Sequence, residues 1–190
     1  IFDDIEMAQE LFRDDGYQRR CEAKVTKVEL RGFYVNRTVF YPVGGGQPGD
    51  CGSLELRDGQ KIRIVDTLKE KNSGDILNVL EEGVDSFQVG DTVMLEIDWK
   101  RRHRLMRMHS CMHLLCAVIP AAVTGGSVRD GSARLDFDLP EPPDKQQIES
   151  SLNRLIEEDH AMSLQWITAQ ELEKQPELVR TMSVSPPLGT

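Results

Sequence analysis

Two histidines, His109 and His113, stand four residues apart in the segment HSCMH. On a helix this spacing places both imidazoles on one face, one turn apart. Imidazole nitrogen is a preferred zinc ligand, so such a pair supplies two of the four ligands of a zinc ion. The alternative is a pair of histidines with a packing role alone. Cys116 shares their face and is either a third ligand or a buried packing residue.

Other zinc chemistries are disfavoured by what surrounds the pair. No glutamate lies between the two histidines, so the general base of the HExxH metallopeptidases is missing. The remaining histidines, His103 and His160, stand alone in the sequence. A zinc ion with four ligands therefore needs at least one ligand from elsewhere.

A glycine-rich segment runs from Tyr41 to Asp50, with the sequence YPVGGGQPGD. Consecutive glycines adopt backbone torsions that other residues avoid, and they let a ligand approach the main chain closely. The lysine and hydroxyl residue of a P-loop are absent, and the flanking prolines favour a stiff turn. The segment is therefore either a ligand-contacting loop or a tight connection between strands.

A cluster of positive charges lies just before the histidine pair, on a chain that is otherwise acidic. Its members are Lys100, Arg101, Arg102, Arg104 and Arg107. A phosphate backbone would bind such a patch with release of counterions, whereas a solvated charged surface is the alternative. Trp99 is the only aromatic residue next to the cluster in the sequence, so stacking of single-stranded bases is not indicated.

The composition is that of a globular protein, with 39% hydrophobic and 29% charged residues in 190. The net charge of −9 argues against binding of nucleic acid by bulk charge, so any nucleic acid must meet a local patch. No apolar run approaches the ~18 residues of a spanning helix, and the first residues are acidic where a signal peptide is basic. We expect a cytoplasmic protein with no membrane or DNA partner and with four free thiols.

Residues 1–99 have the pattern of a small β-barrel that carries the glycine-rich segment. A short helix is expected over 5–13, ended by Asp14, Asp15 and Gly16. Strands are expected over 21–30, 33–41, 53–56, 61–65, 76–80 and 91–99. The pair Asp58-Gly59 predicts a hairpin between the third and fourth of these strands.

Residues 100–190 have the pattern of an α+β domain. Apolar residues recur at intervals of three and four from Leu105 to Ile119, which predicts a helix that Pro120 ends. A strand is expected over 134–139, a second helix over 142–162 and a further strand over 164–167. The repeat of apolar residues along the chain thus changes from two residues, typical of strands, to 3.6 residues, typical of helices, near residue 100.

Together these motifs resemble the alanyl-tRNA editing proteins, the AlaX family, which are similar to the editing domain of alanyl-tRNA synthetase. The segment FYPVGGGQPGDCG over 40–52 looks like the family's glycine-rich loop, and RMHSCMHLL over 107–115 looks like its histidine helix. The order of the two motifs fits, as do LDFD over 135–138 and a strand near 179–181. The resemblance covers the chain from residue 12 to residue 190.

The resemblance implies an α+β fold in which a small N-terminal β-barrel precedes an α+β editing domain like that of the threonyl- and alanyl-tRNA synthetases. It implies one zinc ion held by His109 and His113 with a cysteine and a histidine from a downstream CxxxH motif, and it makes Cys116 a packing residue. This sequence ends at Thr190 before any such motif. We therefore expect the editing domain to be incomplete at its C-terminal end and the remaining zinc ligands to lie beyond Thr190.

The implied activity is hydrolysis of the ester that joins serine or glycine to alanine tRNA, so mischarged tRNA(Ala) is the expected partner. Zinc would orient the aminoacyl group or a water, and His109 and His113 are the expected catalytic residues. Contact with substrate is expected from Gly44, Gly45, Gly46 and Gln47. Thr124 is expected to hydrogen-bond the serine hydroxyl, which would spare alanyl-tRNA, with a plain loop position as the alternative. The basic cluster is expected to bind the tRNA.

Two other functions remain open. A tRNA-binding module associated with a synthetase would bind tRNA and leave the ester intact. The activity of a zinc hydrolase of a small ester or amide would be insensitive to charge reversal at Arg101 and Arg102. After the same change an editing enzyme would bind tRNA more weakly and with a shallower salt dependence. The occurrence of several separate motifs in the right order favours editing.

Overall fold

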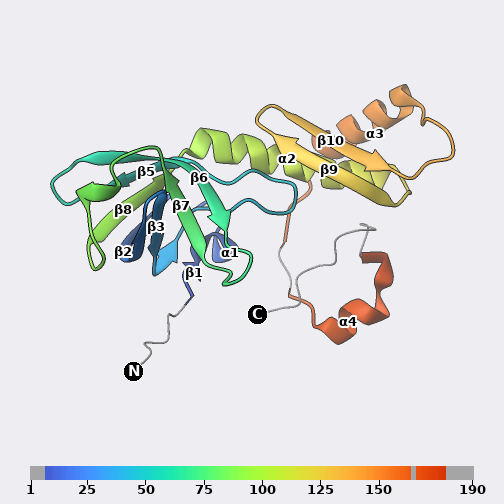
Figure 1. Ribbon diagram of the computed structural model, residues 1–190. Helices are drawn as coiled ribbons and strands as arrows, with labels where there is room; N and C mark the ends of the chain where they lie inside the picture. The colour runs from blue at the N-terminus through green and yellow to red at the C-terminus, as the bar shows by residue number, and fades with distance from the viewer. Residues whose placement is uncertain (1–6, 164–165, 179–190) are drawn as a thin grey trace. The chain divides into compact units, whose positions relative to one another are not determined.

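The computed structural model describes residues 7–163 and 166–178. The chain forms two compact units, Ile1–Leu105 and Met106–Thr190 (Figure 1). The division falls within helix α2 (Trp99–Val118), whereas the sequence places the domain boundary after residue 99. The fold class is α+β, with a closed barrel in the first unit and a mixture of helices and a hairpin in the second.

The first unit is a closed barrel of six strands, as the sequence predicts. Around the barrel the strands are β2 (Arg20–Glu29), β3 (Gly32–Val35), β7 (Ile76–Leu80), β6 (Lys61–Lys69), β5 (Gly52–Glu55) and β8 (Thr92–Ile97). Neighbouring strands are antiparallel throughout. Along most of β2 and β6 every second residue is buried, because alternate side chains of a strand point to opposite faces.

The interior of the barrel is a single apolar core. Its fully buried side chains include Phe33, Phe40, Leu54, Ile64 and Leu95. Complete burial of one such side chain stabilises the fold by about 1.5–3 kcal/mol. The core therefore gives the barrel a large stabilising term of its own.

The turns of the barrel follow the sequence signals with one exception. Gly59 has a φ of +88° in the connection between β5 and β6, so the predicted Asp58-Gly59 hairpin is confirmed. The single strand predicted over 33–41 is wrong, since β3 ends at Val35 and the two-residue β4 (Arg37–Thr38) follows. The Asn36 side chain accepts a hydrogen bond from the Lys24 N–H at 2.8 Å and interrupts the ladder there.

The helix predicted over 5–13 is much shorter in the structure. After β1 (Gln9–Glu10), which pairs with β4, helix α1 (Leu11–Asp14) makes a single turn, and residues 5 and 6 lie outside the described residues. Its buried residue is Phe12, whose ring meets the ring of Tyr41 edge-on at 5.5 Å. A 3-10 turn, η1 (Val84–Ser86), completes the described elements of this unit.

The second unit contains most of α2 and a hairpin of β9 (Val123–Arg129) and β10 (Ser132–Phe137). Helix α3 (Lys145–Glu157) follows, then α4 (Ala169–Lys174) and the 3-10 turn η2 (Pro176–Leu178). Asp144 caps α3, because its carboxylate accepts the N–H groups of Gln146 and Gln147 at 2.9 and 3.2 Å. The two long helices that the sequence predicts are confirmed, although α3 is shorter than the predicted 142–162.

The second unit differs from the sequence predictions at one strand that they omit, and two predicted strands lie wholly or partly outside the described residues. Strand β9 was not predicted, because Gly125 and Gly126 lower the strand propensity of its middle. In the strand predicted over 164–167, Trp166 and Ile167 belong to no strand, and 164–165 are outside the described residues. The strand expected near 179–181 also lies outside them.

Among the described residues, no helix has both the length and the apolar character needed to cross a membrane. The four cysteines, Cys21, Cys51, Cys111 and Cys116, are free thiols.

Candidate functional site

The histidine pair lies on the part of α2 that belongs to the second unit. The rings of His109 and His113 are stacked nearly parallel, with centroids 5.1 Å apart and an interplanar angle of 15°. The spacing of four therefore brings the imidazoles together, as predicted. Burial, and then the electrostatic influence of the neighbouring His113, lower the pKa of His109. A lowered pKa favours the neutral imidazole, which is the form that binds a metal.

The donor set fits zinc as a pair of ligands. Two imidazoles held one turn apart on a helix suit two positions of a tetrahedral ion. Within 7–163 and 166–178, no group of three or more histidine, cysteine, aspartate or glutamate side chains is arranged to hold a metal ion. Cys116, which is half-buried, therefore does not complete a site with the two histidines.

Thr124 lies on strand β9 and not in a loop. Val123 pairs with Phe137 and Gly125 with Asp136, so Thr124 is an extra residue in an irregular step of the ladder. Such a β-bulge re-aims a side chain, and bulges are frequent beside active sites. The Thr124 side chain is exposed, so its hydroxyl is accessible to a ligand.

Gly126 brings β9 close to the helix that carries the histidines. A Cβ at this position would lie 2.9 Å from Leu135 Cδ1 and 3.1 Å from Met112 Cε. Met112 directly precedes His113 on α2. The glycine therefore leaves room for the Leu135 and Met112 side chains, whose ends would have to shift to accommodate a Cβ.

The glycine-rich segment is a tight turn in the first unit. Gly44 and Gln47 exchange backbone hydrogen bonds, with N···O distances of 3.1 and 2.9 Å. Gly45 and Gly46, at the centre, have φ values of +58° and +78°, the pattern of a type I′ turn. These two glycines are exposed, whereas Gln47 is buried. Of the four predicted contact residues, Gly45 and Gly46 thus present their backbone most openly.

A buried ion pair fixes the end of the glycine-rich segment. The side chains of Asp50 and Arg102 are only 1% and 3% exposed. Arg102 Nε donates to both Asp50 carboxylate oxygens at 2.9 and 2.8 Å, and its Nη2 donates to the Val39 carbonyl at 2.7 Å. The Tyr41 N–H donates to Asp50 Oδ2 at 2.7 Å. The prediction that Arg102 binds tRNA is therefore wrong, because its guanidinium is enclosed in the barrel unit.

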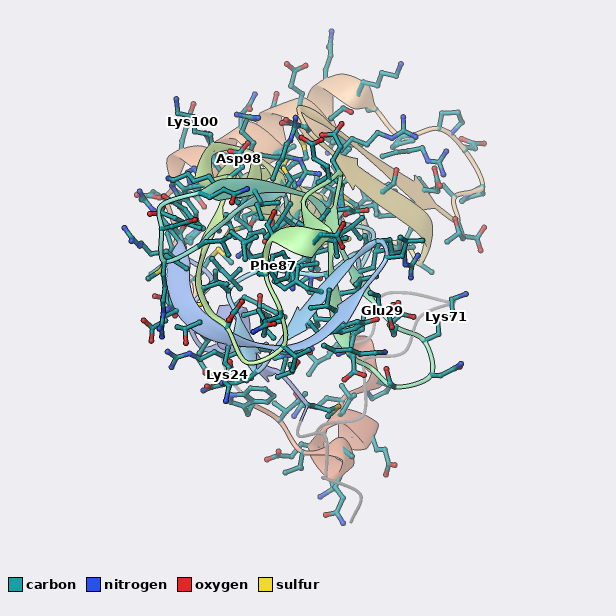
Figure 2. The ribbon with its side chains drawn as sticks, turned by 60° about the vertical axis from the view of Figure 1, so that its left-hand side comes forward. Lys24, Glu29, Lys71, Phe87, Asp98 and Lys100 are labelled. Atoms are coloured by element: carbon teal, nitrogen blue, oxygen red, sulfur yellow. The ribbon has the colours of Figure 1, made fainter. Side chains whose placement is uncertain are left out.

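The other members of the basic cluster differ in exposure. Arg101 is half-buried, and its Nη1 donates to the Gly49 carbonyl at 2.7 Å. Lys100, Arg104 and Arg107 are exposed on α2. Figure 2 shows Lys100 projecting outward near Asp98, where the last barrel strand gives way to α2. Three cations therefore remain accessible to a phosphate backbone.

Trp99 has an aromatic partner that the neighbouring sequence does not indicate. The ring of Tyr17 lies 5.3 Å from that of Trp99 and 6.1 Å from that of His103. No local sequence signal connects residues this far apart, because the barrel topology alone brings them together. The basic cluster is thus accompanied by more aromatic surface than the sequence indicates.

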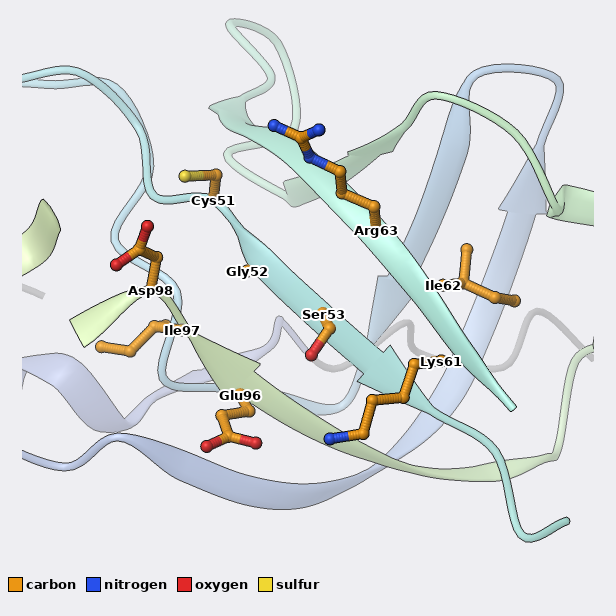
Figure 3. A pocket seen from close by; sticks show the side chains of 9 residues that line it. All are labelled: Cys51, Gly52, Ser53, Lys61, Ile62, Arg63, Glu96, Ile97 and Asp98. Atoms are coloured by element: carbon orange, nitrogen blue, oxygen red, sulfur yellow. The ribbon is translucent and has the colours of Figure 1, made fainter. Parts of the chain in front are cut away.

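A hollow of ≈ 430 Å³ on the barrel includes none of the predicted site residues. It lies over β5, β6 and the end of β8, beside Cys51 and Ser53 (Figure 3). Its charged lining residues have opposite signs, with Lys61 and Arg63 facing Glu96 and Asp98. Burial raises the pKa of the Cys51 thiol, which disfavours the reactive thiolate. The raised pKa of Cys51 thus argues against a thiolate nucleophile in this hollow.

Comparison with known proteins places these features in a family. Residues 5–101 match the family model of the class II (A) tRNA synthetases. The alanyl-tRNA editing protein AlaX-M of Methanosarcina mazei is 35% identical over 190 residues, which cover 93% of this chain and 74% of that protein. The chain belongs to the alanyl-tRNA editing protein family.

Further relatives extend this family assignment to both units. The AlaX-M protein of Pyrococcus horikoshii is 31% identical over 197 residues, covering 98% of this chain and 85% of its own length. An alanine–tRNA ligase of Metallosphaera sedula is 44% identical over 115 residues, 60% of this chain and 12% of the ligase. As a member of the alanyl-tRNA editing family, the chain combines a small barrel with an α+β editing domain.

Proposed function

We propose that the chain is an aminoacyl-tRNA deacylase that removes serine or glycine from mischarged tRNA(Ala), with a zinc ion held by His109 and His113. The observation that carries the proposal is the stacked histidine pair on α2, 5.1 Å between ring centroids, in a member of the alanyl-tRNA editing family. The names of the AlaX-M relatives support editing of alanine tRNA as the general activity.

The chain's own residues divide the work between the metal and the substrate. When bound, zinc polarises a carbonyl or lowers the pKa of a water. His109 and His113 hold it as neutral imidazoles, which the lowered pKa of His109 favours. In the barrel unit, Gly45 and Gly46 offer exposed backbone for contact with the substrate.

Thr124 supplies the discrimination between serine and alanine. Its exposed hydroxyl at the β9 bulge hydrogen-bonds the serine side chain. Alanine has no hydroxyl, so alanyl-tRNA would leave the threonine without this partner. The correctly charged tRNA is thereby spared.

The RNA backbone binds the exposed cations of α2. Lys100, Arg104 and Arg107 neutralise phosphates, while Arg102 holds the barrel together through Asp50. Neutralised phosphates release counterions, so affinity falls as the salt concentration rises. The acidic remainder of the chain confines the RNA to this local patch.

Metal content and turnover, measured together, test the proposal. His113→Ala is expected to weaken zinc binding and deacylation of seryl-tRNA(Ala) by at least about 10–100-fold, because loss of even an outer-shell partner of a metal costs that much. His160→Ala is the matched control, because that histidine is exposed and its partner is Glu158, not His109 or His113. It is expected to leave both quantities unchanged.

Two results would contradict the proposal. One is a His113→Ala protein that retains zinc and full deacylation. The other is a folded, zinc-loaded wild-type protein that binds tRNA(Ala) yet leaves the seryl ester intact, which is the behaviour of a binding module.

A further inference from the structure

An aromatic cluster lies at the end of the barrel unit where α2 begins. It consists of Tyr17, Trp99 and His103, with the guanidinium of Arg19 added. The Trp99 and His103 rings are stacked, with centroids 5.2 Å apart and an interplanar angle of 20°. The Tyr17 ring lies 5.3 Å from Trp99, and the Arg19 guanidinium lies over the Trp99 ring at 4.6 Å. The cluster is therefore a contiguous aromatic surface with a cation at its side.

The barrel holds this cluster in place through its backbone. The Ile97 N–H donates to the Arg19 carbonyl at 3.0 Å, and Arg102 Nη1 donates to the Gly16 carbonyl at 3.2 Å. These two bonds fix the segment that carries Tyr17 against the first turns of α2. Trp99 is partly buried and packs on the barrel core. The cluster is therefore preorganised before any ligand binds.

Tyr17 is the open member of the cluster. It is 60% exposed, a large fraction for an aromatic ring that already has two ring partners. Arg19, whose guanidinium lies over the Trp99 ring, is exposed, and so is Lys100, the residue after Trp99 on α2. The Asp15 carboxylate accepts the Tyr17 N–H at 2.8 Å and that of Asp98 accepts the Arg101 N–H at 3.0 Å, so both acidic groups are tied to the backbone of their own segments. The surface thus offers an exposed aromatic ring in a cluster that carries the Arg19 guanidinium.

We propose that Tyr17 is a stacking platform for an unpaired RNA base, with the exposed Arg19 and Lys100 as cations for the phosphates of the same RNA. The proposal deepens the proposed function and rests on it. Every nucleobase has a π-face, so a platform of this kind accepts single strands without reading their sequence. An acidic peptide would satisfy the two cations but has no planar group for the ring. An RNA with an unpaired base supplies both kinds of contact in one molecule.

Fluorescence of Trp99 reports binding at this surface directly. The chain has two tryptophans, so Trp166→Phe leaves Trp99 as the single emitter. The probes are an RNA hairpin with an unpaired 3′ tail and the same hairpin with a blunt end. We expect the tailed RNA to quench Trp99 and to bind more tightly than the blunt one.

Substitution of Tyr17 isolates the stacking contribution. In the Trp166→Phe background, Tyr17→Ala is expected to weaken binding of the tailed RNA by about five- to a hundredfold, the range for loss of one base–aromatic stack. Tyr17→Phe is the matched control, because it keeps the ring and removes only the hydroxyl. Binding of the blunt hairpin is expected to change less than twofold in either variant.

Three results would overturn the platform. The first is equal affinity of the Tyr17→Ala protein and its parent for the tailed RNA. The second is equal affinity of the parent for tailed and blunt RNA. The third is quenching of Trp99 by a polyglutamate peptide but not by RNA, which would assign the surface to an acidic protein.

Deacylation of seryl-tRNA(Ala) by the wild-type protein, measured alongside, separates this proposal from the proposed function. Turnover together with tail-independent binding would overturn the platform alone. Absence of turnover together with tail-dependent, Tyr17-dependent binding would overturn the deacylase and leave the platform standing.

Discussion

The two units of the molecule differ in how firmly their side chains are packed. The barrel encloses a core whose large side chains are fully buried, and it also buries the Asp50–Arg102 ion pair. Among the described residues of the second unit, the buried apolar side chains are Ile119, Val123 and Val128. On α3, Leu152 is only half-buried and Ile156 is 52% exposed.

This difference assigns separate tasks to the two units. The residues of the glycine-rich segment are held from within the barrel, so their positions depend on the stability of that unit. The histidine pair and Thr124 sit on the surfaces of a helix and a hairpin in a unit with few buried side chains. Substitutions in the barrel should therefore change stability first, and substitutions in the second unit should change chemistry first.

The largest effect is expected from breaking the buried ion pair. Asp50→Asn leaves the Arg102 guanidinium without its carboxylate, and such a loss costs about 3–5 kcal/mol. Denaturant unfolding of the barrel measures this loss of unfolding free energy. Glu55→Gln is the control, because its pair with Lys61 is 3.2 Å long with side chains 40% and 58% exposed, and about 1 kcal/mol or less is expected. Equal losses in the two variants would show that the buried pair does not stabilise the barrel.

Truncation of one leucine in each unit tests the packing difference directly. Leu95→Ala empties a fully buried site in the barrel and should destabilise it by about 2–5 kcal/mol. Leu152→Ala removes a half-buried side chain from α3 and should cost less than about 2 kcal/mol. Unfolding free energies from urea titrations give both values. A larger loss at Leu152 than at Leu95 would reverse the comparison.

A smaller effect is expected at the bulge of β9. Thr124→Val removes one hydroxyl and should narrow the preference for the seryl over the alanyl ester by roughly 0.5–1.5 kcal/mol, or about two- to twelvefold in the ratio of rates. Thr124→Ser retains the hydroxyl and should preserve the preference. The deacylation rates of the seryl and alanyl esters, measured for each variant, give the ratio that tests this prediction. An unchanged ratio in Thr124→Val would remove Thr124 from the substrate site.

The smallest effect is expected from an exposed arginine of the basic cluster. Arg107→Ala should leave the unfolding free energy within about 0.5 kcal/mol of wild type, since Arg107 is exposed. It should also make the dependence of log affinity for tRNA on log salt concentration shallower, by up to about 0.9 in the magnitude of the slope. Binding titrations at several salt concentrations provide the slope. An unchanged slope would place the RNA away from Arg107.

Much of the fold was predictable because its signals are local. Alternating apolar residues and the Asp58-Gly59 turn predict the strands of the barrel, and the recurrence from Leu105 onward predicts α2. The histidine pair was equally accessible, since a spacing of four on a helix fixes adjacency without any tertiary information.

The rest depends on contacts between distant residues. A run of basic residues is typical of a surface, and nothing local reveals that Arg102 turns inward to meet Asp50. Tyr17 likewise meets Trp99 only because the segment before β2 runs beside the start of α2. Strand β9 could not be predicted because Gly125 and Gly126 lower the strand propensity of its middle, where Gly126 packs against the end of the Met112 side chain.

In the proposed function the histidine pair supports selective removal of the wrong amino acid. The most direct measurement is the hydrolysis rate of seryl-tRNA(Ala) beside that of alanyl-tRNA(Ala), for the wild-type protein and for His109→Ala. We predict that the wild-type protein removes serine and spares alanine, and that the variant loses at least about 10–100-fold in the seryl rate. A His109→Ala protein that hydrolyses the seryl ester at the wild-type rate would contradict the account.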